Sequence, residues 1–218
     1  MIIAIDGPVA SGKSTAARNL ASSLGFSYLD TGAIYRALTL MARRLALDVT
    51  DSATVRAMLA RAEVRLDGDH VFLNGEDVSD EIRLPEISNS VRPLAENADV
   101  RTFVKDLEHA LASGKNVVVE GRDMGTVVFP DADTKIFLTA SPEDRARRRW
   151  EELERRGTPQ DYEDVLADLI RRDEADTTRH IAPLRQAADA LRVDTTGLSA
   201  DESAALLLAT VRDKLEGL

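Results

Sequence analysis

The stretch from Gly7 to Ser14, GPVASGKS, is the feature of this sequence that most constrains its fold. It matches the pattern G-x-x-x-x-G-K-[S/T] at every fixed position. The apolar run over residues 1–5 predicts a buried strand before it, and alanine and leucine at helical spacing over residues 16–24 predict a helix after it. A glycine-rich turn between a strand and a helix places backbone N–H groups around anionic oxygens. The sequence therefore predicts a phosphate-binding loop.

The side chains of this loop have expected roles in holding a nucleotide with its metal. We expect a solvated Lys13 to bring positive charge to the β- and γ-phosphates, and the hydroxyl of Ser14 to bind Mg²⁺. A chance match in an ordinary loop is the alternative, and the strand–turn–helix context disfavours it. The predicted ATP-binding residues are consecutive in the chain: Gly7, Pro8, Val9, Ala10, Ser11, Gly12, Lys13, Ser14 and Thr15.

Composition narrows the class of protein. A length of 218 residues suggests one domain with small insertions, and the net charge of −10 disfavours binding to long nucleic acids. The absence of cysteine excludes disulfides and thiolate metal sites, and the 3 histidines match no metal-ligand spacing. No apolar run approaches the ~20 residues of a membrane span. Because the first strand begins at Met1, we expect no signal peptide and a cytoplasmic protein.

Strands and helices alternate along most of the chain. Further buried strands are expected at residues 26–29, 117–119, 135–138 and 190–193, which predicts an α/β fold with a five-stranded parallel sheet flanked by helices. Residues 63–99 differ, because short strand-like runs separated by Asp-Gly and Asn-Gly turns predict a small antiparallel insert. Capping boxes are expected at Ser141–Asp144, Thr158–Asp161 and Ser199–Glu202.

Polar residues follow two of the predicted strands, at the edge of the sheet where ligands bind in such folds. Asp30 begins the run DTGAIYR, and Glu120 begins EGRDMG. Glu120 is placed to hold Mg²⁺, directly or through water, and an exposed strand-end carboxylate is the alternative. Arg122 and Asp123 set a bidentate donor beside an acceptor, which suits a phosphate next to a base or hydroxyl. The alternative for these two residues is a structural ion pair.

Arginine is concentrated in the second half of the chain. Four arginines occur within residues 145–149, and Arg171, Arg172 and Arg179 follow. Such a run is often a solvated helix face. Phosphoryl transfer, however, needs positive charge near the equatorial phosphate oxygens. We therefore expect a catalytic role for at least one of Arg148 and Arg149, and a plain surface position for Arg171.

Several longer motifs resemble those of bacterial cytidylate kinases over nearly all of the chain: IDGPVASGKST, LDTGAIYRA, LNGEDVSDEIR, EGRDMGTVVFPDA, KIFLTAS and RRDEADTTR followed by APL. The resemblance implies a P-loop kinase fold. Its core ATP-binding domain would comprise residues 1–62, 100–144 and 180–218, with a nucleoside-monophosphate-binding insert at 63–99 and a helical lid at 145–179. It also implies a monomer that transfers a phosphoryl group from ATP to CMP or dCMP with Mg²⁺.

The resemblance also assigns roles to individual residues. Asp123 should contact the cytosine amino group and Arg122 the acceptor phosphate, while Arg148 and Arg149 match lid arginines. The full set implied to bind the acceptor nucleotide is Asp30, Thr31, Tyr35, Arg36, Arg101, Arg122, Asp123, Arg172, Asp176 and Arg179.

The sequence departs from this family at two places. Arg92 stands where relatives commonly carry a serine that bonds the base, and Glu108-His109 replaces a common Gln-Arg pair. The first departure concerns base contacts, and we expect the second to alter surface contacts only.

Three other functions are alternatives for a chain with this phosphate-binding loop. A small-metabolite kinase of the same fold would have shorter insertions than residues 63–99. A GTPase would need an Asn-Lys-x-Asp motif, which this sequence lacks. A degenerate ATP-binding protein is disfavoured by the intact Lys13, Ser14 and Glu120.

Overall fold

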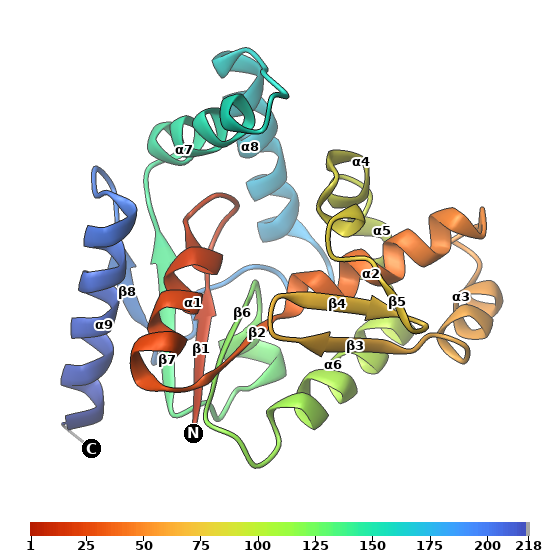
Figure 1. Cartoon of the computed structure of the whole chain (residues 1–218), viewed down its shortest axis with the longest axis horizontal. Helices are drawn as coiled ribbons and strands as arrows, with labels where there is room; N and C mark the ends of the chain where they lie inside the picture. The colour runs from red at the N-terminus through yellow and green to blue at the C-terminus, as the bar shows by residue number, and fades with distance from the viewer. Residues whose placement is uncertain (217–218) are drawn as a thin grey trace. The chain divides into compact units, whose positions relative to one another are not determined.

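The computed structural model describes residues 1–216 of the chain (Figure 1). These residues form two compact units. The first contains Met1–Leu29 and the chain from Gly114 onward, and the second contains Asp30–Ser113. Within the described part of the chain, no helix has both the length and the apolar character needed to cross a membrane.

A five-stranded sheet forms the centre of the first unit and confirms the predicted parallel arrangement. The strand order is β2-β6-β1-β7-β8. In the register of this sheet, Asp6 lies beside Gly121 on one neighbouring strand and beside Phe137 on the other. The residues that follow β1 and β6 therefore begin at the same edge. The strands are β1 (Ile2–Asp6), β2 (Ser27–Asp30), β6 (Val117–Gly121), β7 (Thr134–Thr139) and β8 (Leu191–Asp194).

Two helices pack against this sheet through apolar side chains. Helices α1 (Lys13–Leu24) and α9 (Ala200–Glu216) lie side by side (Figure 1). Their buried faces meet the strands in one core that contains Ile3, Ile5, Leu20, Ile136 and Leu207. Helices α7 (Pro142–Arg155) and α8 (Tyr162–Thr178) form a pair with a smaller core of their own.

The second unit contains the predicted antiparallel strands, β3 (Val64–Asp67), β4 (His70–Leu73) and β5 (Glu76–Asp77), in the order β3-β4-β5. Its core joins apolar residues of this small sheet to helices on both sides of it in sequence. This shared core makes the compact unit wider than the expected insert at 63–99. The division into core, insert and lid stays a prediction. The helices are α2 (Thr31–Arg44), α3 (Ser52–Leu59), α4 (Pro85–Ser88), α5 (Arg92–Ala95), α6 (Ala98–Ala112) and the 3₁₀ turn Glu81–Arg83.

The three predicted capping boxes have different outcomes. The Ser199–Glu202 box is confirmed, because the Ser199 hydroxyl accepts from the Glu202 N–H and the Glu202 carboxylate accepts from the Ser199 N–H. The box at 158–161 is wrong, because helix α8 begins after Asp161 and Thr158 instead closes the last turn of α7. The box at 141–144 is half formed: Ser141 caps α7, but the Asp144 carboxylate is turned to other partners.

Candidate active site

The predicted phosphate-binding loop, residues 7–14, connects β1 to α1. A Cβ atom at Gly7 would lie only 2.0 Å from the carbonyl oxygen of Leu138 on β7, so only glycine fits there. Gly12 has a left-handed φ of 84° at the N-cap of α1, which glycine adopts without strain. Steric constraints therefore favour glycine at both positions of the motif.

Lys13 is buried, with 5% of its surface exposed, so the expectation of a solvated side chain is wrong. Its Nζ atom donates to the carbonyl oxygen of Pro8 at 2.6 Å and to the Ser11 hydroxyl at 3.3 Å. The ammonium group of Lys13 is therefore bound by residues of the same phosphate-binding loop. The sequence could not predict the burial of Lys13, because this burial results from residues that the fold brings around the loop.

The electrostatics of Lys13 connect it to the predicted acceptor residues. Burial, followed by the positive charge of Arg122, lowers the pKa of Lys13 to about 7, while Glu120 and Asp176 act in the opposite direction. An ammonium group at this place therefore lacks full compensation in the absence of ligand. Phosphate oxygens would supply the missing negative charge and favour its protonated form.

This shift makes the stability of the nucleotide-free protein depend on pH. The pKa of Lys13 is about 7 in the folded state, whereas an unperturbed lysine has a pKa of 10.5. Between these values the unfolded chain binds more protons, so stability should rise with pH. We expect wild type to gain up to ~1.4 kcal/mol per pH unit relative to Lys13→Met. Urea unfolding of both proteins at pH 7, 8 and 9 measures this difference, and parallel profiles would contradict it.

Two ion pairs bring four predicted substrate residues together. Arg122 Nε donates to Asp176 Oδ2 at 2.8 Å, and Arg179 Nη2 donates to Asp123 Oδ1 at 3.0 Å. Each pair joins the segment after β6 to the end of α8 or just beyond. Arg122 and Asp123 thus each form an ion pair with a residue distant in sequence, which agrees with the alternative of a structural ion pair. Their contacts with a substrate stay predictions. Burial opposes ionisation of Asp176, yet Arg122 holds the pKa of that carboxyl below its usual range.

Positive charge gathers beside these pairs. Burial, and then the proximity of Arg122, lowers the pKa of Arg172, and Arg149 contributes in the same direction. Arg149 also forms an ion pair with Glu152 at 2.8 Å, and Arg172 a loose one with Asp168 at 3.9 Å. Arg172 thus experiences repulsion from two other guanidinium groups, and this repulsion favours the binding of an anion near Arg172.

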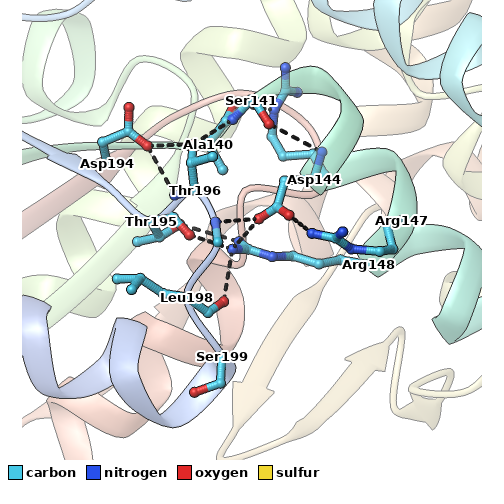
Figure 2. Close-up of polar contacts among 12 residues, drawn as sticks. Ala140, Ser141, Asp144, Arg147, Arg148, Asp194, Thr195, Thr196, Leu198 and Ser199 are labelled. Carbon is cyan, nitrogen blue, oxygen red and sulfur yellow. Dashed lines mark hydrogen bonds and ion pairs between the residues drawn. The ribbon is translucent and has the colours of Figure 1, made fainter.

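Arg148 is held by the loop that follows β8, as Figure 2 shows. Its Nη2 atom donates to the carbonyl oxygens of Thr195 at 2.6 Å and Leu198 at 3.1 Å, and forms an ion pair with Asp144 at 3.0 Å. A Cβ atom added to Gly12 would lie 3.8 Å from Arg148 Nη1. The guanidinium therefore lies close to the phosphate-binding loop but is occupied by protein partners. Its catalytic role stays a prediction.

The remaining predicted substrate residues belong to the second unit. Asp30 caps α2 by accepting the N–H of Ala33 at 3.0 Å, and its other oxygen accepts from Arg36 Nη2 at 2.8 Å. Thr31 is buried and Tyr35 half-buried on the same helix. Arg101 on α6 donates to the carbonyl oxygen of Ala95 at 3.3 Å. Each of these hydrogen bonds joins two residues of the second unit.

Arg92, the first of the two expected departures from the family pattern, is exposed and forms an ion pair with Glu96 at 2.7 Å.

The predicted metal ligands offer oxygen atoms only. Ser14 is exposed in the first turn of α1. Glu120 is buried and its Oε1 atom accepts from the Tyr28 hydroxyl at 2.6 Å, so the alternative of an exposed strand-end carboxylate is wrong. Within residues 1–216, the structure contains no group of three or more histidine, aspartate or glutamate side chains that could hold a metal ion by themselves. These residues fit Mg²⁺, which binds through one or two protein oxygens together with phosphates and water.

Asp6 is a site residue that sequence reasoning missed. Its two carboxylate oxygens accept the backbone N–H groups of Met124 and Gly125, each at 2.8 Å. These bonds hold the start of a one-turn π-helix, Met124–Val128, directly after Asp123. Burial raises the pKa of Asp6 to about 6. The sequence did contain a sign of this role, because Asp6 is a carboxylate at the end of an apolar strand, immediately before the phosphate-binding loop.

Replacing Asp6 by asparagine should destabilise the protein by ~1–3 kcal/mol. An amide offers one acceptor oxygen to two donors, so one buried N–H loses its partner. The matched control is Asp133→Asn, because Asp133 accepts the single N–H of Ile2 on the same strand. Urea unfolding should show a smaller loss for the control. Equal stability of Asp6→Asn and wild type would contradict the anchoring role of this carboxylate.

Known proteins are similar to this chain over nearly its whole length. The family model described as "Cytidylate kinase" matches residues 3–213. The cytidylate kinase of Caldanaerobacter subterraneus subsp. tengcongensis is 46% identical over 99% of this chain and 96% of that protein. The cytidylate kinase of Pelotomaculum thermopropionicum is 48% identical over 96% of this chain and 95% of that protein.

Solved structures support the fold. An uncharacterised protein from Eubacterium ventriosum has a TM-score of 0.53 at 13% identity, covering 97% of this chain and 98% of that one. A protein from Thermus thermophilus has a TM-score of 0.52 at 21% identity, covering 99% of this chain and 97% of that one. Similarity at this level of identity concerns the fold alone.

Proposed function

The chain belongs to the cytidylate kinase family, and we propose on this basis how its own residues transfer the γ-phosphoryl group of ATP to CMP or dCMP. The bond from the γ-phosphorus to the β–γ bridging oxygen breaks, and a new bond forms from the γ-phosphorus to a 5′-phosphate oxygen of the acceptor. The products are ADP and CDP or dCDP. The family match over residues 3–213 carries this conclusion, and the grouping of Lys13 with Arg122 supports it.

On the donor side, we assign the phosphate-binding loop, residues 7–15, to ATP. Lys13 would leave its internal partners, Pro8 and Ser11, and donate to the phosphates instead. A group buried among protein dipoles gives strong stabilisation when negative charge develops, because little water competes. Its position beside Arg122 suits a group that acts where donor and acceptor phosphates meet.

On the acceptor side, we assign Arg122 to the phosphate of CMP and Asp123 to the base. An ionised carboxylate only accepts hydrogen bonds, so Asp123 suits the N4 amino group of cytosine. Asp176 and Arg179 are proposed to contact the sugar and phosphate. The other residues that we propose to bind the acceptor nucleotide are Asp30, Thr31, Tyr35, Arg36 and Arg101.

Transferred charge would be stabilised by arginines of the proposed lid, residues 145–179. Arg172 interacts unfavourably with both Arg122 and Arg149, and a phosphate that arrives beside it would relieve this repulsion. Arg148 would have to leave Thr195 and Leu198 to contact a phosphate. We therefore propose Arg149 as the more readily available of the two predicted catalytic arginines.

Mg²⁺ is proposed to arrive with ATP and to be held by Ser14 and, directly or through water, by Glu120. When bound, this ion would neutralise part of the negative charge of the phosphates. Tyr28 fixes the orientation of the Glu120 carboxylate through its hydrogen bond of 2.6 Å. A cytoplasmic location and a monomeric state also stay predictions.

A panel of acceptors tests the proposed function. Purified protein with ATP and Mg²⁺ is supplied separately with CMP, dCMP, UMP, AMP or shikimate, and ADP production is followed. We expect the highest kcat/KM with CMP and dCMP. Faster turnover of AMP or shikimate would overturn the acceptor assignment. Turnover unaffected by removal of Mg²⁺ with EDTA would overturn the metal assignment.

A further inference from the structure

The crest of the phosphate-binding loop, Val9 and Ala10, is fixed by side chains of the α7–α8 pair. The backbone N–H of Val9 donates to Asp173 Oδ1 on α8 at 3.1 Å. Its carbonyl oxygen accepts from Arg145 Nη1 on α7 at 2.9 Å. Both backbone groups of one loop residue are therefore bound by two helices that lie more than 130 positions later in the sequence.

The two side chains that hold Val9 also hold each other. Arg145 Nη1 donates to Asp173 Oδ2 at 2.5 Å, and Arg145 Nε donates to the carbonyl oxygen of Ala140 at 2.9 Å. Arg145 is 5% exposed. A buried guanidinium with this many partners has one strongly preferred geometry, because any other would leave a desolvated charge without compensation.

Ala10 adds an apolar contact to these bonds. It packs against the core of the helix pair, which contains Ala146, Leu153, Val165 and Leu169. Ala10 also has a φ of 56°, a left-handed conformation that is unfavourable for a residue with a Cβ atom. The surrounding contacts must offset this cost, so the loop shape at Ala10 depends on the helices that hold it.

We infer that Arg145 and Asp173 are positioning residues that set the shape of the ATP-binding loop and link it to the acceptor site through α8. Asp173 binds the loop, and Asp176, one helical turn later, binds Arg122, the proposed ligand of the acceptor phosphate. A shift of α8 therefore moves partners of both nucleotides. This inference rests on the proposed function for the identity of the acceptor, while the contact with the ATP loop stands independently of it.

The first test compares Asp173→Ala with Glu174→Gln, a control that removes one negative charge at the next, exposed position of α8. Affinities for the non-hydrolysable analogue β,γ-imido-ATP and for CMP are measured by calorimetry, each alone and with the other ligand saturating. We expect Asp173→Ala to weaken binding of the ATP analogue by ~10-fold and to bring the coupling factor between the ligands close to one. CMP affinity alone should change less than about 2-fold.

Three results would overturn the inference. The first is unchanged analogue affinity and coupling in a folded Asp173→Ala protein, and the second is an equal loss of affinity for both ligands. The third is the same change in the control. Arg145→Ala should reproduce the effect of Asp173→Ala, and the double variant should add little, because both residues act through Val9.

A second measurement needs no variant and no acceptor. Hydrogen exchange of the Val9 amide in the wild-type protein reports directly on its bond to Asp173. We expect exchange to be slower by at least ~10-fold than for an unstructured amide. Exchange at the unprotected rate would overturn the inference. If no acceptor in the panel is phosphorylated, the proposed function fails, yet Val9 protection and analogue binding still decide the role of Arg145 and Asp173.

Discussion

Replacement of Lys13 by methionine is expected to lower kcat for CMP phosphorylation by ~10²–10³-fold, because one preorganised donor to the developing charge is lost. Methionine keeps an unbranched stem in a position where wild type exposes only 5% of the side chain. Initial rates with saturating ATP, Mg²⁺ and CMP measure the effect. Because the buried positive charge is only partly compensated, its removal should leave the folded state at least as stable at pH 7.

The control for this experiment is Lys115→Met, which removes an exposed lysine between α6 and β6. Its kcat should stay within about 2-fold of wild type, since surface substitutions usually have small effects. A folded Lys13→Met protein with near-normal kcat would contradict the role of Lys13. An equal loss in both variants would point to net charge as the cause.

Substitution of Asp123 by asparagine is expected to lower kcat/KM for CMP by at least ~10-fold, while the value for UMP falls much less or rises. Cytosine presents an N4 donor where uracil presents an O4 acceptor, and an asparagine amide can donate to that acceptor. A 10-fold loss corresponds to about 1.4 kcal/mol of transition-state stabilisation. Measurement of kcat/KM for both acceptors in both proteins gives the ratio.

The ion pair between Asp123 and Arg179 complicates this substitution, because both partners are buried with 6% side-chain exposure. Part of the loss can come from weakening that pair, and this part should affect CMP and UMP equally. The ratio of the two kcat/KM values separates base recognition from this general effect. Arg92→Ala is the companion variant, because a guanidinium can donate to uracil O4. A CMP:UMP ratio unchanged by Asp123→Asn would show that Asp123 does not read the base.

Local patterns predicted the elements of this fold well. The phosphate-binding loop, the parallel strands and the antiparallel insert follow from periodicity and from glycine positions, which act over a few residues. The extent of the compact unit at Asp30–Ser113 could not be read in this way, because its core joins helices α2, α3 and α6 to the insert. The false capping box at Thr158 has a similar cause, since Thr158 closes the turn that ends α7.

The sequence motifs named candidate residues for the site, but they did not predict how these residues interact with one another. Motifs identified Arg122, Asp123, Asp176 and Arg179, but only the fold shows that they pair across two segments. The burial of Lys13 likewise depends on groups that are distant in sequence. Arg145 and Asp173 were missed for the same reason, because their contacts with the loop span more than 130 residues.

One competition experiment tests the central claim most directly. The protein is given ATP, Mg²⁺ and equal concentrations of CMP and AMP in one tube, and phosphorus-31 NMR follows all nucleotides during the reaction. CDP should appear in a one-to-one ratio with ADP while the AMP resonance stays constant. Loss of AMP in preference to CMP, or formation of ADP and free phosphate without CDP, would contradict the assignment of this protein as a kinase of cytosine nucleoside monophosphates.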